Sequence, residues 1–353
     1  MKKITKLLLI AGFILAGQCV VYGQQGKIAL HHNGGLTIYT DLTIALAGAQ
    51  NGDTLYLPGG TVYCSSGVTI NKTLTIIGAG HFPDSTAATY KTVIPTTVYV
   101  LTGADNGSLS GIQCENLEFG TGYSAQNVNN YRIERCKIGT LRPSQDNTST
   151  SQNIQIYENV IENLVGSNYG WPPVYLGFST AIFEKNIFGT IQYEKVALFN
   201  NNIFYSPAYT FTLSMSTFNN CIIIYTGSNQ AFFIGSTNTI FNNTLVCKND
   251  TNGLTLYYTG MSNNPVNSEY VGNTFINAAS GIFSYSNNYH LKTTSNGHNA
   301  GTDGTDIGIF GTQFPAKDGA VPFNPHISSK SIGTVVSPSG TLSVDVKVSA
   351  QDR

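Results

Sequence analysis

The sequence predicts an all-β solenoid, in which short strands coil repeatedly on copies of themselves. Three observations support this fold class: a phrase of two polar residues and an apolar run recurs along the middle of the chain, its spacing is irregular and near ~20 residues, and helical periodicity is missing from the repeated region. The second polar residue, taken as the anchor of each phrase, lies at Asn116, Cys136, Asn159, Asn186, Asn202, Cys221, Asn243, Asn273 and Asn288.

Stacking of the coils explains the form of the phrase. Parallel strands on successive coils lie about 4.8 Å apart, so equivalent side chains form rows along the solenoid. The anchor Asn side chains are expected at corners, where they bond backbone groups that the turn leaves unpaired. The apolar residues two positions past the anchors are expected to fill the core: Ile138, Ile161, Phe188, Phe204, Ile223, Leu245 and Phe275.

The N-terminus has the pattern of a secretory signal peptide. Lysines near the start precede an apolar run over 7–16, and Gly23 offers a small residue for cleavage. The run is too short to span a membrane, and no other stretch of the sequence has the length and composition to do so. A lipid anchor at Cys19 is disfavoured because Gln18, rather than a small residue, precedes it. We therefore expect residues 1–23 to be removed and the protein to be exported, to the extracellular space, the cell surface or the periplasm.

One short helix is expected, over residues 41–50. Leu42, Leu46 and Ala49 would share one face, and Asp41 can cap the first turn. A helix of this kind, at the start of the array, would cover the open end of the first coil.

The opening and closing segments carry a resemblance to a known family. The strand that begins at Gly52-Asp-Thr, the strand pair over 68–80 and the glycine-rich phrase over 301–311 resemble right-handed parallel β-helix proteins of the pectate-lyase-like superfamily. The resemblance covers roughly residues 28 to 311. It implies a right-handed parallel β-helix and raises the expectation of a polysaccharide lyase, glycoside hydrolase or esterase.

The aspartates that such enzymes would need are sparse. Between Asp105 and Asp250 only Asp146 occurs. The resemblance implies several Asp ligands for a calcium-dependent lyase, and a hard cation needs six or more oxygen ligands. The sequence therefore lacks a recognisable catalytic set, and neither a metal nor a cofactor is expected.

The last part of the chain has a different pattern. After a Pro- and Gly-rich stretch, every second residue from Leu342 to Val348 is apolar, which predicts a strand of a β-hairpin. We expect the hairpin to cap the last coil and block end-to-end association, with a sorting or docking module as the alternative. The expected organisation is a signal peptide over 1–23, a β-helix domain with its N-terminal cap over 24–311, and a capping segment with a hairpin over 312–353.

The composition also disfavours some partners. Charged residues make up 10% of the chain and the net charge is −1, so a basic face for nucleic acid is not expected. The cysteines beyond the signal have the spacing of neither a zinc site nor a disulfide framework, although Cys114 and Cys136 lie one coil apart. We expect small buried apolar side chains at Cys64, Cys114, Cys136, Cys221 and Cys247.

Charged side chains occur one position before the anchor in four phrases, at Glu115, Arg135, Glu158 and Lys185. One interpretation is a row of alternating ion pairs on a solvated face, each worth about 0.2–1 kcal/mol. The other is a lyase site with Arg135 or Lys185 as the proton-abstracting base opposite Glu158. Interleaved carboxylates favour the charged form of a base, so they support the structural interpretation.

Two polar loops interrupt the coils beside these charges. One contains Arg142 and Asp146, and the next contains Tyr169, Trp171 and Tyr175. Aromatic faces on a polar loop suit sugar rings, whose hydroxyls take polar partners. The alternative is that Trp171 packs onto its own coil.

The sequence thus favours a secreted or cell-surface β-helix protein that binds extracellular polysaccharide without catalysis. The alternatives are a lyase or hydrolase of pectate-lyase-like type and a structural surface component. The oligomeric state and the glycan are left open.

Overall fold

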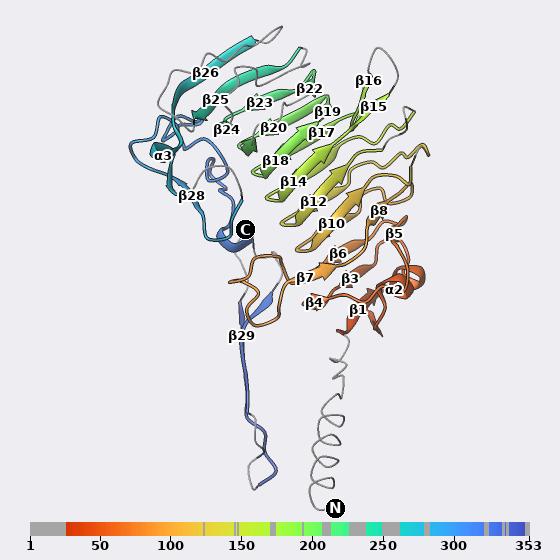
Figure 1. Cartoon of the computed structure of the whole chain (residues 1–353). Coiled ribbons are helices and arrows are strands. Elements are labelled where there is room, and N and C mark those ends of the chain that lie inside the picture. Colours follow the sequence, from red (N-terminus) through yellow and green to blue (C-terminus); the bar gives the residue numbers. More distant parts are fainter. Residues whose placement is uncertain are drawn as a thin grey trace, which may run out of the picture.

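The computed structural model describes residues 26–349 apart from 123, 145, 147, 170–173, 193, 207–212, 226–237, 249–261, 279–282, 321–324, 334–335 and 337–338. It is a parallel β-helix whose coils stack along one axis (Figure 1), as the repeated phrases predict. The predicted signal peptide lies outside the described residues. No helix among the described residues is long and apolar enough to cross a membrane.

Each coil contributes strands to parallel ladders. The first ladder contains β3 (Thr54–Tyr56), β6 (Thr75–Ile77), β9 (Ser108–Ser110), β11 (Arg132–Glu134), β13 (Ile154–Tyr157), β17 (Ala181–Glu184), β20 (Ala197–Asn200), β23 (Thr217–Asn219), β25 (Ile240–Lys248) and β26 (Ser262–Tyr270). The second contains β4 (Gly60–Thr61), β7 (Thr92–Ile94), β10 (Gln113–Glu118), β12 (Lys137–Arg142), β14 (Val160–Val165), β18 (Ile187–Gln192), β21 (Ile203–Ser206) and β24 (Ile222–Tyr225), and continues into β25 and β26.

Shorter parallel pairings complete the coils. β5 (Val68–Ile70) pairs with β8 (Val98–Val100), which in turn pairs with the C-terminal half of β10. β19 (Glu194–Lys195) pairs with β22 (Leu213–Ser214). An antiparallel hairpin of β15 (Ser167–Tyr169) and β16 (Val174–Leu176) extends from one coil.

The N-terminal cap contains the predicted helix, α2 (Leu42–Gly48), together with two strands that were not predicted, β1 (Ile28–His32) and β2 (Gly35–Tyr39). Asp41 caps α2 by accepting a hydrogen bond from the Thr43 N–H at 2.8 Å. At the other end, the Lys72 ammonium donates to three carbonyls of the last turn, including that of Ala49 at 2.7 Å. The buried face of α2 is therefore fixed over the first coil.

The core is filled by the predicted rows of apolar side chains. Ile138, Ile161, Phe188, Phe204 and Ile223 are buried and occupy equivalent register positions in the second ladder. In the first ladder the rings of Phe183, Phe199, Phe218 and Phe241 stack at centroid distances of 4.7–4.8 Å, one coil apart.

The prediction is wrong in four phrases: the phase is shifted in two of them, and the other two are not coils. Cys114 pairs with Ile138, so Ile112 rather than Asn116 occupies the anchor position of that coil. Val246 rather than Leu245 pairs with Ile223. Beyond β26 the chain leaves the ladders: after α3 (Val271–Thr274), β27 (Phe275–Asn277) pairs antiparallel with β28 (Asn288–Leu291), so the phrases at Asn273 and Asn288 are not coils.

The anchor Asn side chains form a buried row at one corner. Asn159 Oδ1 accepts from the Cys136 N–H at 2.9 Å, and Asn186 Oδ1 accepts from the Asn159 N–H at 2.9 Å. Asn202 Oδ1 continues the row by accepting from the Asn186 N–H at 2.8 Å. The predicted role of these residues at corners is therefore confirmed.

After β27 the chain runs back along the side of the solenoid. We call residues 283–320, which include β28 and end in the 3₁₀ helix η1 (Asp318–Ala320), the return segment. Thr302 and Gly308 bond to Asn220, the Lys317 N–H lies 3.4 Å from Glu158 Oε2, and the Gly319 carbonyl accepts from Ser85 at 2.8 Å. These contacts follow the solenoid from late coils to early ones.

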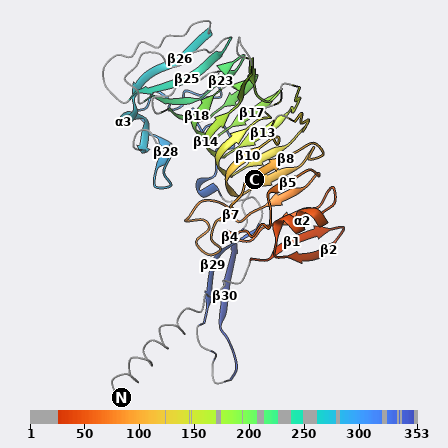
Figure 2. The same ribbon diagram turned by 45° about the vertical axis from the view of Figure 1, so that its right-hand side comes forward.

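The predicted C-terminal hairpin is present as β29 (His326–Ile332) and β30 (Val344–Ser349). It does not cap the last coil. It projects beyond the first coils (Figures 1 and 2), and the Lys330 ammonium lies 5.8 Å from the ring centroid of Tyr90. The return segment carries the chain back to that end, which the local hairpin pattern did not indicate.

Candidate functional site

The outer face of the first ladder is hollowed on two stretches. One hollow, of about 820 Å³, lies over β6, β9 and β11, and the other, of about 710 Å³, lies over β17, β20, β23 and β25. Residues 313–315 and 317 form one wall of the first hollow, and residues 300–302 and 312 form one wall of the second. We call the two together the outer-face groove.

Strand alternation determines what the groove displays. Successive side chains of a strand point to opposite faces, so the residues on either side of a buried core residue face the groove. Around Ile133 these are Arg132 and Glu134, and after Phe199 comes Asn200. The groove is therefore polar although it lies directly over the apolar core.

Three amides form a row along the floor of the second hollow. Asn219 Nδ2 donates to Asn200 Oδ1 at 3.0 Å, and Asn242 Nδ2 donates to Asn219 Oδ1 at 2.9 Å. An Asn side chain has two N–H donors and two acceptor lone pairs, and each link of the row uses one of each. The remaining donors and lone pairs lie along the axis at intervals of one coil.

The acids of the groove all lie beside bases. Arg132 contacts Glu134 at 2.7 Å and lies over the Tyr157 ring, 5.1 Å from its centroid. Glu184 pairs with Lys185 at 2.7 Å. The third acid, Glu158, accepts from Arg135 Nε at 2.8 Å. Because the charges are compensated locally, the groove has no strongly acidic or basic stretch.

A second row marks the corner beside the groove. Its members have φ between 50° and 64°, the left-handed region that Gly and Asn adopt most readily. The row, which we call the corner row, contains Gly111, Arg135, Glu158, Lys185, Asn201, Asn220 and Asn243. Three consecutive coils thus have a charged residue where the other members are Gly or Asn.

The structure corrects the expectation of a solvated row of charges. Arg135 is 1% exposed and Lys185 is 8% exposed, because the return segment lies beside this corner. Arg135 and Glu158 form the expected ion pair, but Lys185 pairs with its neighbour Glu184 instead of Glu158. Glu115 does not belong to the row, since the register places Gly111 there.

The predicted carbohydrate-binding residues lie elsewhere. Tyr169 and Tyr175 are in the β15–β16 hairpin; their side chains and the whole of Trp171 fall outside the described residues. Arg142 lies at the end of β12 and contacts Glu118 at 3.5 Å. Asp146 accepts hydrogen bonds from the Thr148 hydroxyl and from the Thr148 N–H, which lower the pKa of its carboxyl group.

Sequence reasoning did not identify the amide row of the groove. The signal was present, because Asn200, Asn219 and Asn242 each directly precede a residue of the corner row, giving consecutive asparagines in three phrases. One Asn of each pair turns the corner and the other faces the groove. The same residue type therefore occupies two different positions, one at the corner and one facing the groove.

Comparison of the chain with protein-family models, with curated proteins and with solved structures gives no match. Among the described residues, no group of three or more His, Cys, Asp and Glu side chains is placed to hold a metal ion.

Proposed function

We propose that the chain is an exported, noncatalytic β-helix protein of the pectate-lyase-like type that binds extracellular polysaccharide along the outer-face groove. The observation that carries the proposal is the row of Asn200, Asn219 and Asn242. Sugar hydroxyls both donate and accept hydrogen bonds, so amides with spare donors and lone pairs are suitable partners for them.

The geometry of the groove favours a linear polymer over a small ligand. Polar groups repeat once per coil, about 4.8 Å, along an open face rather than converging on one point. The Tyr157 ring and the Ser and Thr side chains of β6 and β9 extend the polar face toward the N-terminal coils. A polymer lying parallel to the solenoid axis would meet equivalent groups on successive coils.

The charge balance of the groove favours a neutral polysaccharide over a polyuronate. An acidic polymer would need several unpaired bases, whereas Arg132 and Arg135 are both engaged by carboxylates and Lys317 is the one base among the described lining residues without an ion pair. The proposal of export depends on the signal-peptide pattern of residues 1–23 and on the resemblance described above.

The test compares retention of the chain on neutral and on uronic polymers. Because a net hydrogen bond contributes about 0.5–1.5 kcal/mol, Asn219→Ala should weaken retention on the preferred polymer by about threefold to tenfold. The matched control is Asn163→Ala, which removes an amide from the outer face of β14, outside the groove. Equal retention of both variants would remove the amide row from the proposal.

A polysaccharide lyase is the second candidate. It is favoured by the charged residues of the corner row, because left-handed backbone at residues other than Gly or Asn is a form of strain that gathers at functional sites. Incubation with uronic polymers and measurement of ultraviolet absorbance from unsaturated sugar ends tests it, with Lys185→Gln as the variant. If the unaltered chain forms unsaturated products and Lys185→Gln does not, the lyase proposal replaces the noncatalytic one. If the chain is retained on no glycan, a structural surface component is favoured.

A further inference from the structure

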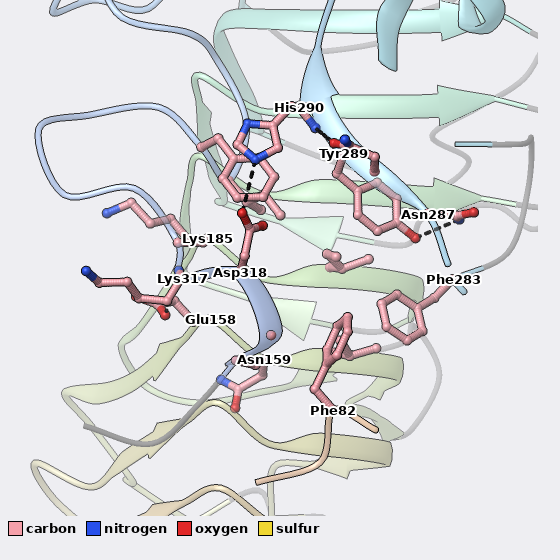
Figure 3. A pocket seen from close by; sticks show the side chains of 18 of the residues that line it. Phe82, Glu158, Asn159, Lys185, Phe283, Asn287, Tyr289, His290, Lys317 and Asp318 are labelled. Atoms are coloured by element: carbon pink, nitrogen blue, oxygen red, sulfur yellow. Dashed lines mark hydrogen bonds and ion pairs between the residues drawn. The ribbon is translucent and has the colours of Figure 1, made fainter. Parts of the chain in front are cut away.

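A separate cavity of about 360 Å³ lies between the solenoid and the return segment. Its walls come from the loop at His81 and Phe82, from the solenoid corner at Val160 and Ile187, and from the return segment. Figure 3 shows Phe82, Glu158 and Tyr289 from these three walls. Cavities that hold small ligands commonly have this size and combine apolar walls with a few polar groups. The cavity is distinct from the outer-face groove, and Glu158 and Lys317 line both the cavity and the groove.

Aromatic rings line one side of the cavity. The rings of Phe283 and Tyr289 are nearly parallel, with 11° between their planes, and Phe82 lies on the same side (Figure 3). The Tyr289 hydroxyl is held by Asn287 Nδ2 at 2.9 Å. Ring faces of this kind pack against flat apolar surfaces such as another aromatic ring or the C–H face of a sugar.

His81 is the unsatisfied polar group of the cavity wall. The side chain is fully buried, Nδ1 lies 3.2 Å from the Tyr285 hydroxyl, and Nε2 has no hydrogen-bond partner among the described residues. Burial lowers the pKa of His81 to about 3, so the ring is neutral at physiological pH. A neutral imidazole has one donor and one acceptor nitrogen, and a hydroxyl group can satisfy Nε2 in either tautomer.

Most of the charged side chains around the cavity have a partner of opposite charge, and Lys317 is the exception among the described residues. Glu158 is engaged by Arg135, Lys185 by Glu184, and His290 lies 3.4 Å from Asp318 at the solvent side. In Figure 3 the ammonium ends of Lys185 and Lys317 point away from the aromatic side chains. A charged ligand would therefore find no opposite charge to pair with inside the cavity.

We propose that this cavity binds one neutral ring compound that carries a hydroxyl group, with the ring against Phe283 and Tyr289 and the hydroxyl on His81 Nε2. The ring is either a single sugar unit or a free phenol, since both combine a flat apolar face with a hydroxyl. This proposal goes beyond polysaccharide binding in the groove and does not depend on it.

The experiment uses the intact chain with methyl β-glucoside and phenol as separate probes, followed by saturation-transfer NMR and calorimetry. At least one probe should bind, and His81→Phe, which keeps a ring but removes the nitrogen, should weaken that binding about tenfold or more. Ala316→Phe should abolish binding by filling the cavity from the return segment. His31→Phe, at an exposed position of β1, is the matched control and should bind like the unaltered chain.

The probe that binds identifies the source of the ring, a sugar or a phenol. The proposal is overturned if neither probe binds, or if His81→Phe and Ala316→Phe both bind as tightly as the unaltered chain. Retention of polymer by the groove should be unchanged in both variants, so failure of this proposal is distinguishable from failure of the groove proposal.

Discussion

A buried asparagine at the corner of a coil satisfies backbone groups that no strand can reach. Asn186 shows this best: its Oδ1 accepts from the backbone and the side chain of Asn159, and its Nδ2 donates to the Ile156 carbonyl at 2.8 Å and to Asn202 Oδ1 at 3.1 Å. Each buried group left unpaired costs about 1–3 kcal/mol. The row of Asn side chains therefore holds the backbone of the corner in place. Loss of one Asn should lower the stability of the fold, because it leaves buried backbone groups unpaired.

We expect Asn186→Ala to lower the free energy of unfolding by at least about 2 kcal/mol, because it leaves several buried donors and acceptors unpaired. Asn242→Ala removes an exposed amide that has one link to Asn219, so its effect should stay within about 0.5 kcal/mol. Urea unfolding of both variants measures the difference. Similar midpoints would show that water replaces the lost amide at Asn186.

A second set of left-handed residues lies at the corner before the first-ladder strands. Asn106, Asn130, Asn153 and Asn238 are at equivalent positions, and so are Val196 and Met215, all with positive φ. Left-handed backbone costs an ordinary residue about 1–2 kcal/mol, and Asn less. Val196 and Met215 are therefore strained relative to the Asn positions.

Met215→Asn should raise the free energy of unfolding by about 0.5–1 kcal/mol, since Met215 is exposed and the change relieves backbone strain. Met215→Leu keeps the strain and should have no such effect. Thermal unfolding of the two variants distinguishes relief of backbone strain from loss of the packing of Met215. If packing dominates, Met215→Asn should unfold at a lower temperature than Met215→Leu.

At the scale of the element, β19 buries a carboxyl group. Glu194 is fully buried, its Oε1 accepts from the Phe178 N–H at 3.2 Å, and its Oε2 has no partner among the described residues. Burial raises the pKa of Glu194 from 4.5 to about 8. The folded chain therefore holds a proton that the unfolded chain releases across that range.

The contribution of Glu194 to the stability of the fold should consequently fall as the pH rises from about 4.5 to about 8, and level off above. Below that window both states are protonated, so no penalty exists there. Burial lowers the pKa of His81 to about 3, which has the opposite effect on stability below about pH 6.5, so the net fall is expected above that pH. Glu194→Gln keeps the acceptor for Phe178 and should remove this pH dependence, with a gain on the order of a few kcal/mol at the alkaline end. Urea midpoints across the window measure it. Glu162→Gln, at an exposed partner of Lys137, should keep the original pH profile.

The elements that sequence could predict are those specified locally. α2 has its cap at Asp41 and its apolar face within a few residues, and the core row from Ile138 to Ile223 follows from the phrase alone. The anchor was wrongly placed at Asn116 because the residues Cys114 and Glu115 before it match the repeated phrase. The actual register of this coil is set by the pairing of β10 with β12. The phrases at Asn273 and Asn288 have the residue pattern of a coil, but they belong to β27 and β28, which pair antiparallel outside the ladders.

At the scale of the whole molecule, the return segment decides what the corner row can do. It docks along the row through Asn243, Asn220 and Asn201, and it covers the charges at Arg135. Such docking joins residues that lie far apart in the sequence, so no local pattern indicates it. The groove wall and the cavity both exist because of it, and neither could be predicted from the repeats.

The attachment of the return segment can be loosened at one residue without straining the corner. Asn220 Nδ2 donates to Thr302 Oγ1 at 3.0 Å, and Asn220 Oδ1 accepts from the Thr302 N–H at 3.2 Å. Asn220→Gly removes both bonds, and also the bond that Asn220 Oδ1 accepts from Asn243 Nδ2 at 2.8 Å, while Gly readily adopts the φ of 51° at this position. Asn238→Gly makes the same exchange at an exposed left-handed position of the other corner.

We expect backbone amides of residues 300–311 to exchange with deuterium about tenfold or more faster in Asn220→Gly, because the two hydrogen bonds to Thr302, of about 0.5–1.5 kcal/mol each, are lost. Asn238→Gly should leave their exchange unchanged, and the unfolding midpoints of the two variants should be similar. If exchange over 300–311 stays slow in Asn220→Gly, packing of Ile307 and Ile309 against Ile203 and Ile222 holds the segment instead. The segment would then be part of the core rather than a layer docked on the corner row.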